Sequence, residues 1–289
     1  MSVLKKSDLN LTLAQRLLLL GCIFVVCTVI TSFMASLFAS FVAAHFNAGF
    51  RIVAVVQDVM VFIVPSLVTA IMVTRRPADL LALTSSPGKN DLLCVLVILI
   101  VSIPFMESVI EWNRNLIFPE WMSGFESKAR EMENSSSQPL LRLMADKSVF
   151  ALILNVLIVG VAAGFSEELL FRGTFQRLLT TGGVNRHISV WIVAAVFSLL
   201  HFQLFGFVPR LLLGAYFGYL LLWTGSLWVP MTAHILNNTV YVVSSWIAVR
   251  NGGDMASSSV QASWPVYLTV ASCVATAAAL AVIYRNHRR

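Results

Sequence analysis

The amino-acid sequence predicts an all-α protein, a polytopic membrane bundle of about eight transmembrane helices. Hydrophobic residues make up 58% of the 289 positions and charged residues only 12%, against about 25% in soluble domains. The mean hydropathy is correspondingly high, at +0.82. Apolar runs long enough to cross about 30 Å of hydrocarbon recur along the whole chain. Few residues are left over for a soluble domain, so we expect one integral membrane domain.

The apolar runs set the expected spans. These cover residues 13–41, 52–73, 92–110, 149–179, 188–205, 209–223, 227–247 and 264–284. The first run is too long to be the core of a cleavable signal peptide, so we expect it to remain as an anchor. The chain then divides into N-terminal helices with an outer loop (1–148), a central core (149–247) and a C-terminal helix with a basic tail (248–289).

The distribution of charge predicts the orientation of the bundle. Lysines and arginines number 20, against 14 aspartates and glutamates, which gives a formal net charge of +6. In the expected topology most of these cations lie at one face, which the positive-inside rule assigns to the cytoplasm together with both termini. Anionic lipid headgroups explain such residues, so we expect membrane lipid as a partner and no nucleic acid. The compact length favours a prokaryotic inner or plasma membrane.

The longest connection, residues 111–148, falls on the opposite, outer face and carries much of the remaining charge. Residues 126–133 have the composition of a short surface helix, and the serines at 135–137 are expected to break it. We interpret this segment as a solvated connector, with a lid or a substrate contact as the alternative.

One otherwise apolar span carries three ionisable residues, Glu167, Glu168 and Arg172. A charge at the centre of a membrane helix costs roughly 2.5–3.5 kcal/mol on insertion scales, so such residues mark a functional site by default. Arg172 follows Glu168 by one helical turn, and this spacing predicts an ion pair that leaves Glu167 free to titrate. The alternative is that the pair serves structure alone.

Two later spans repeat the four-residue spacing, with Phe197 before His201 and His234 before Asn238. Counted from the cytoplasmic end of each span, the depth is about 18 Å for Glu167, 20 Å for His201 and 17 Å for Asn238. His234 lies about 6 Å shallower than Asn238. Polar groups from three helices thus reach one layer of the membrane, as an active site requires. Phe197 is expected to pack against them and shape the pocket.

The chemistry of this set is that of a hydrolase. A glutamate in a low-dielectric site has its proton affinity raised, which suits it to take a proton from water and return it to a leaving amine. One imidazole can orient that water. A second imidazole and an asparagine amide can donate to the oxyanion of a tetrahedral intermediate, a contribution of about 2.7–4 kcal/mol per donor. Hydrolysis of a peptide bond needs such a base, an oriented water and donors to the oxyanion.

Three motifs follow one another along the chain: EExxxR at residues 167–172, FxxxH at 197–201 and HxxxN at 234–238. In order and spacing they resemble the CPBP family of intramembrane endopeptidases, also called Abi, which includes CAAX prenyl proteases and bacteriocin-processing and immunity proteins. Each motif alone is weak, but the three in order within a polytopic protein are specific. The resemblance covers about residues 150–245 and implies that the core 149–247 is a CAAX-protease catalytic core.

The resemblance also implies roles for the residues. Glu167 would be the general base, His201 would help to activate the water, and His234 with Asn238 would form the oxyanion hole. Glu168, Arg172 and Phe197 would support them. We expect no cofactor, because asparagine is a poor zinc ligand and neither histidine lies in an HExxH helix. The alternative is a zinc enzyme with Glu167, His201 and His234 as ligands.

Other polar or small residues within the spans are given structural interpretations. The pair Gln57-Asp58 is expected to be structural, with a substrate or proton path as the alternative. Arg210 is expected to extend to the membrane interface. The spacing of Gly214 and Gly218 predicts close packing of helices, with a dimer face as the alternative.

Two classes of function remain open. The first is an intramembrane endopeptidase that acts on a peptide or a membrane-protein substrate. The second is a non-proteolytic immunity or scaffolding protein on the same fold. The intact set of motifs favours the protease. The sequence does not indicate whether the substrate is prenylated, nor the oligomeric state.

Overall fold

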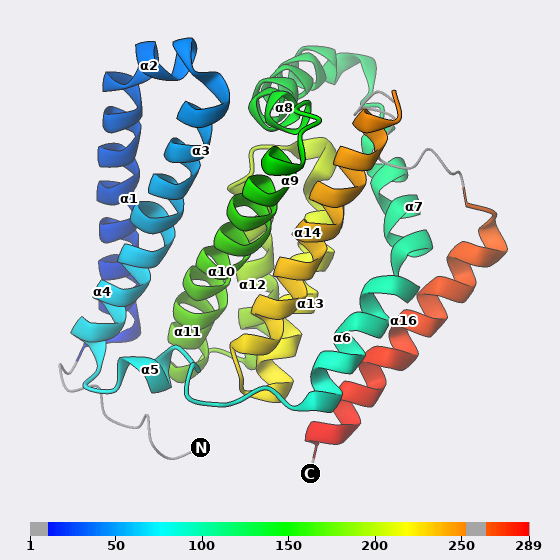
Figure 1. Cartoon of the computed structure of the whole chain (residues 1–289). Helices are drawn as coiled ribbons and strands as arrows, with labels where there is room; N and C mark the ends of the chain where they lie inside the picture. The colour runs from blue at the N-terminus through cyan, green and yellow to red at the C-terminus, as the bar shows by residue number, and fades with distance from the viewer. Residues whose placement is uncertain (1–10, 253–263, 289) are drawn as a thin grey trace.

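The computed structural model describes residues 11–252 and 264–288, and within these ranges every regular element is a helix (Figure 1). This confirms the all-α fold class. Arg289, the last residue of the expected basic tail, lies outside the described residues. The helices are α1 (Leu13–Leu37), α2 (Ala39–Ala44), α3 (Phe46–Gln57), η1 (Asp58–Ile63), α4 (Val64–Val73), α5 (Pro77–Leu80), α6 (Lys89–Val101), α7 (Ile103–Arg114), η2 (Glu120–Met122), α8 (Ser123–Met144), α9 (Val149–Asn155), η3 (Val156–Ala162), α10 (Ala163–Glu168), η4 (Leu169–Gln176), α11 (Arg177–Thr181), α12 (Arg186–Leu199), η5 (Leu204–Gly206), α13 (Phe207–Thr224), α14 (Trp228–Arg250) and α16 (Val266–His287).

The number of membrane spans differs from the eight expected. Five helical stretches in the described part of the chain are long and apolar enough to cross a membrane, and a sixth joins α6 to α7 through a bend of 52°. The five are Leu13–Leu37, Phe46–Val73, Val149–Thr181, Leu204–Thr224 and Val266–His287. Each expected span is largely helical, but α12 has only 14 residues, ends at Leu199 within the expected span 188–205, and α14 is not among the five. The count of eight is therefore not confirmed.

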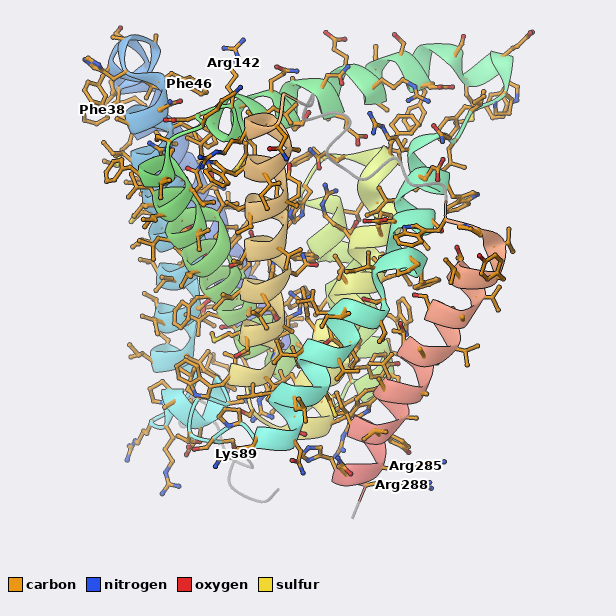
Figure 2. The ribbon with its side chains drawn as sticks, turned by 45° about the vertical axis from the view of Figure 1, so that its right-hand side comes forward. Phe38, Phe46, Lys89, Arg142, Arg285 and Arg288 are labelled. Atoms are coloured by element: carbon orange, nitrogen blue, oxygen red, sulfur yellow. The ribbon has the colours of Figure 1, made fainter. Side chains whose placement is uncertain are left out.

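The long helices stand side by side and alternate in direction (Figure 1). The start of α1 and the end of α16 lie at the same end of the bundle, where Lys89, Arg285 and Arg288 also gather (Figure 2). At the opposite end, α8 lies across the tops of the other helices (Figure 2). In the predicted orientation the end with the termini faces the cytoplasm.

Short-range chemistry explains several helix boundaries. Thr12 and Gln15 form a capping box that begins α1, because each side chain accepts a backbone N–H that the helix leaves unpaired. The Ser148 and Asn185 side chains cap α9 and α12 in the same manner. Gly225 ends α13 with φ of 67°, a left-handed conformation that glycine adopts without strain.

The break expected at residues 135–137 does not occur, because α8 continues from Ser123 to Met144 and passes even Pro139. The serine hydroxyls donate to carbonyls one turn earlier, including Ser136 to Met132 at 2.7 Å. Such bonds satisfy the hydroxyls within the helix instead of competing with it. The connector is thus a long surface helix, not the short helix that the sequence predicted.

The packing is that of a bundle in lipid. Side chains of α1 such as Val25, Val29 and Phe33 point outward and are more than half exposed, as expected for lipid contact. Gly214 and Gly218 lie where a Cβ would come within 3.0 Å of Ala194 and 2.9 Å of Gln176. Their size lets α13 approach α12 and η4 closely, which confirms the packing interpretation of this glycine pair.

Candidate active site

The two glutamates lie at the end of α10, a helical piece of six residues between the π-helical segments η3 and η4. A third π-helical segment, η1, packs against α10 and begins at Asp58. π-Helical turns have an i→i+5 bond pattern, reset the direction of the side chains that follow, and occur frequently at functional sites. The apolar pattern of the sequence gave no sign of them.

Glu168 and Arg172 form the expected ion pair, with 2.6 Å between Glu168 Oε1 and Arg172 Nη1 and no exposure of either side chain. Arg172 Nη2 also donates to the Gly214 carbonyl at 2.9 Å. The guanidinium carbon lies 4.7 Å from the centre of the Phe197 ring and 5.3 Å from that of Phe217. Aromatic faces and a carboxylate thus surround the buried cation.

His234 joins this pair, which the sequence did not predict. Its Nδ1 lies 2.9 Å from Glu168 Oε1, and its Nε2 lies 3.9 Å from Glu167 Oε2. The imidazole stacks on Phe217 with 4.7 Å between ring centroids. Glu168 therefore holds Arg172 and His234 through one oxygen, while Glu167 faces the other side of the imidazole. No local spacing could have revealed a contact between residues 66 positions apart.

His201 lies in the turn directly after α12, not on the helix itself as expected. The next residue, Phe202, has φ of 54°, which ends the helical path. His201 Nδ1 lies 2.7 Å from the Phe197 carbonyl oxygen. A carbonyl only accepts, so Nδ1 carries the proton and Nε2 is left as an acceptor. Glu167 interacts electrostatically with His201.

Phe197 packs against both histidines, as expected. Its ring centroid is 4.9 Å from that of His201 and 5.9 Å from that of His234, and both contacts are edge-to-face. The phenyl ring is buried, so it fixes the separation of the imidazoles without adding a polar group.

Asn238 lies one turn beyond His234 on α14, and its Nδ2 donates to the Val159 carbonyl of η3 at 3.2 Å. The Asn238 Oδ1 accepts from Asn237 Nδ2 at 3.4 Å. The amide thus ties α14 to the span that carries the glutamates, and one of its two N–H groups is engaged there.

Asp58 adds a carboxylate from a different span. Its side chain is buried, its Oδ1 accepts from Ser166 Oγ at 3.3 Å, and it interacts electrostatically with Glu167. The sequence predicts a structural role for the pair Gln57-Asp58, and it does not predict the contact of Asp58 with Ser166, the residue preceding Glu167. The sequence signal for this contact is the carboxylate of Asp58 within an apolar run.

The zinc alternative would need Glu167, His201 and His234 as ligands of one ion. A catalytic zinc site uses three protein ligands at about 2 Å. Within residues 11–252 and 264–288, no three histidine, cysteine, aspartate or glutamate side chains gather in a group that could hold a metal ion. Glu167, His201 and His234 as they lie do not form such a set, and we derive no chemical step through zinc.

Comparison with known proteins supports the resemblance seen in the motifs. Residues 149–240 match the family model described as type II CAAX prenyl endopeptidase Rce1-like. This segment is similar to the Rce1-like family. It contains all the candidate site residues except Asp58. A curated relative, the uncharacterized protein YpbD of Bacillus subtilis (strain 168), is 31% identical over 91 residues, which are 30% of this chain and 43% of YpbD. The match thus spans less than half of that relative, and no solved structure matches.

Proposed function

We propose that this Rce1-like protein is an intramembrane endopeptidase that hydrolyses a peptide bond with Glu167 as the general base. The observation that carries the proposal is the contrast between adjacent carboxylates. Glu168 is fully buried and bound to Arg172 and His234, whereas Glu167 keeps 16% of its side chain exposed and lies no closer than 3.9 Å to His234. Only Glu167 is free to exchange a proton with water.

The first step uses Glu167 and His201. The free Nε2 of His201 accepts one hydrogen bond from the water, and Glu167 takes the other proton as the water oxygen attacks the carbonyl carbon. The π electrons of the carbonyl move to its oxygen, which gives a tetrahedral oxyanion. Glu167 then returns the proton to the amide nitrogen, and the C–N bond breaks to release an amine and a carboxylic acid.

The oxyanion is stabilised by His234 and Asn238. His234 with both nitrogens protonated donates from Nδ1 to Glu168 and directs Nε2–H toward the reacting oxygen. The Glu168 carboxylate, 2.9 Å from Nδ1, accepts this hydrogen bond. The second N–H of Asn238 is the other donor. Each such donor contributes about 2.7–4 kcal/mol to the transition state.

We also propose a setting for this reaction, and the apolar helices and the basic residues at the end with the termini support it. The protein lies in a prokaryotic inner or plasma membrane with both termini in the cytoplasm. Its substrate is a peptide or a membrane-associated protein, and it contacts membrane lipid but not nucleic acid. The reaction proceeds without a metal cofactor.

The test compares wild type with two isosteric variants, Glu167→Gln and Glu168→Gln, on quenched-fluorescence peptides that include prenylated members. E167Q should lower cleavage by at least about 10²-fold at an unchanged melting temperature, because it removes only the base. E168Q should lower the melting temperature, since it leaves Arg172 without its carboxylate. Equal effects on both readouts would refute the division of roles.

Treatment with a chelator tests whether cleavage needs a metal ion. Full cleavage after treatment with a strong chelator supports the metal-free reaction, while loss that zinc restores supports the zinc alternative. If wild type cleaves no peptide that E167Q leaves intact, a non-proteolytic immunity or scaffolding role replaces the protease.

A further inference from the structure

A buried carboxylate from the N-terminal helices has no role in the reaction proposed above. Asp58 lies within the candidate span Phe46–Val73, where it begins η1, and it is 7% exposed. It lies outside residues 149–240, the segment that matches the family model. A carboxylate within an apolar span is costly, and such residues mark functional sites by default.

Asp58 does not serve to balance a cation. Within residues 11–252 and 264–288 it forms no ion pair. Helices α1, α3, α4, α10 and η4 pack against η1, and the cations that they carry have other partners. These cations are Arg16, which donates to the Leu11 carbonyl, Arg51, which donates to Asn155, and Arg172, which binds Glu168. A structural ion pair therefore does not explain Asp58.

The hydrogen bond of Asp58 leads to α10 instead. Its Oδ1 accepts from Ser166 Oγ at 3.3 Å, and Ser166 is fully buried, one residue before Glu167. Adjacent helical residues point about 100° apart, so Ser166 faces η1 while Glu167 faces His234. Asp58 also interacts electrostatically with Glu167. The bond thus links η1 to the helical turn that carries the proposed base.

On its other side, α10 is held against α14. A Cβ at Gly164 would come within 3.0 Å of Ile235, so this glycine lets the two helices approach closely. The piece of helix that carries Glu167 is thus confined between α14 and the bond to Asp58. Glu167 Oε2 lies 3.9 Å from His234 Nε2 of α14, and a shift of α10 away from α14 would lengthen that distance.

We propose that Asp58 is a positioning residue of the active site, which through Ser166 holds Glu167 at the distance from His234 that the reaction needs. This inference rests on the proposed function and adds to it a residue from outside the segment that matches the family. Displacement of a reacting group by about 1 Å can lower a rate about 10²-fold, so one hydrogen bond beside the base is enough to affect catalysis. The N-terminal helices thus contribute to the reaction without contacting the substrate.

The kinetic test compares Asp58→Leu, Asp58→Asn and Ser166→Ala in the full-length protein, on the same quenched-fluorescence peptides. D58L removes the acceptor and should lower kcat by about 10- to 10²-fold while KM stays within about twofold, because Asp58 does not touch the substrate. D58N keeps an oxygen that accepts from Ser166, so it should recover most of this loss. S166A should resemble D58L, and the double variant D58L/S166A should be no slower than either single variant.

Asp91→Leu is the matched control. Asp91 is also a buried aspartate of a candidate span, but it bonds His287 of α16 at 2.8 Å, so D91L should leave kcat unchanged. Ser166 Oγ also lies 3.2 Å from the Ala163 carbonyl and keeps this acceptor in D58L, so the fold should survive. If D58N is as slow as D58L, the charge matters and not the hydrogen bond, and the proposal is wrong.

Hydrogen exchange tests the same bond without cleavage. D58L should speed exchange of the backbone N–H groups of residues 163–168 about fivefold, as expected for the loss of one hydrogen bond, and leave residues 177–181 unchanged. Unchanged exchange at residues 163–168, or a kcat of D58L equal to that of wild type, would overturn the role of Asp58. If wild type cleaves no peptide at all, the proposed function fails, and the exchange result still decides whether Asp58 holds α10.

Discussion

Arg172 and Arg210 are both arginines of the membrane bundle, yet they are held in opposite ways. Arg172 is fully buried and lies 2.6 Å from Glu168, which also binds His234. Arg210 is only partly buried, bonds an uncharged side chain and keeps one nitrogen without a partner. In the first arrangement Nη1 and Nη2 both bind acceptors within the protein, while Nε has none among the described residues, and the ion pair holds the site together. The second retains the capacity to bind something else.

The largest effect that tests this comparison is the loss of the Arg172 charge. Arg172→Met keeps much of the volume but breaks the buried ion pair with Glu168. We expect about 3–5 kcal/mol of destabilisation. The double variant E168Q/R172M should be less destabilised than R172M, because it removes the orphaned carboxylate. Unfolding in mixed micelles measures both. A double variant as unstable as the sum of the single ones would mean that the two residues are not coupled.

An intermediate effect is expected where α8 binds the turn against which Arg210 packs, between α12 and α13. Glu133→Ala removes the acceptor of the Phe205 N–H, and a buried donor left without a partner costs about 1–3 kcal/mol. Hydrogen exchange at residues 205–208 should become faster, while exchange around Glu168 should not change. Glu131→Ala is the control, since Glu131 is exposed on the same helix. Uniform acceleration across the bundle would contradict a local role for Glu133.

The smallest effect concerns a carboxylate outside the spans. The backbone N–H of Ser148 donates to Asp146 at 3.0 Å and holds the pKa of Asp146 below its usual value. A lowered folded pKa gives stability that is present above the unfolded pKa of about 3.9 and is lost as pH falls through the folded value. Asp146→Asn should therefore lower the melting temperature slightly at pH 7 and have less effect near pH 3. A constant difference between the two proteins at both pH values would contradict this linkage.

The parts of the fold that follow local rules were predicted from the sequence. Long apolar runs gave the helices, and the four-residue spacing gave the ion pair of Glu168 with Arg172. Motif spacing selected the segment that the family model matches. These signals depend on residues within one or two turns of each other, where helix geometry fixes the distances.

The remaining parts depend on contacts that no local pattern encodes. The position of Arg210 is set by Glu133, Gln203 and Gly206, so the expectation of an extended side chain failed. The bond between His234 and Glu168 joins residues 66 positions apart. The π-helical segments add residues to turns without changing the apolar character of the span. A hydropathy profile therefore does not detect them.

The arrangement of charge along Val149–Thr181 has a consequence for how the protein is made. Residues 149–166 contain no aspartate, glutamate, lysine or arginine, and the ionisable groups begin only at Glu167. The first half of this 33-residue helix is long enough to partition into lipid unaided. This apolar half can insert first and the charged half can follow, before His234 of α14, which contacts Glu168 at 2.9 Å, has been synthesised. The order of residues in this helix, with apolar residues before charged ones, thus favours its insertion into the bilayer.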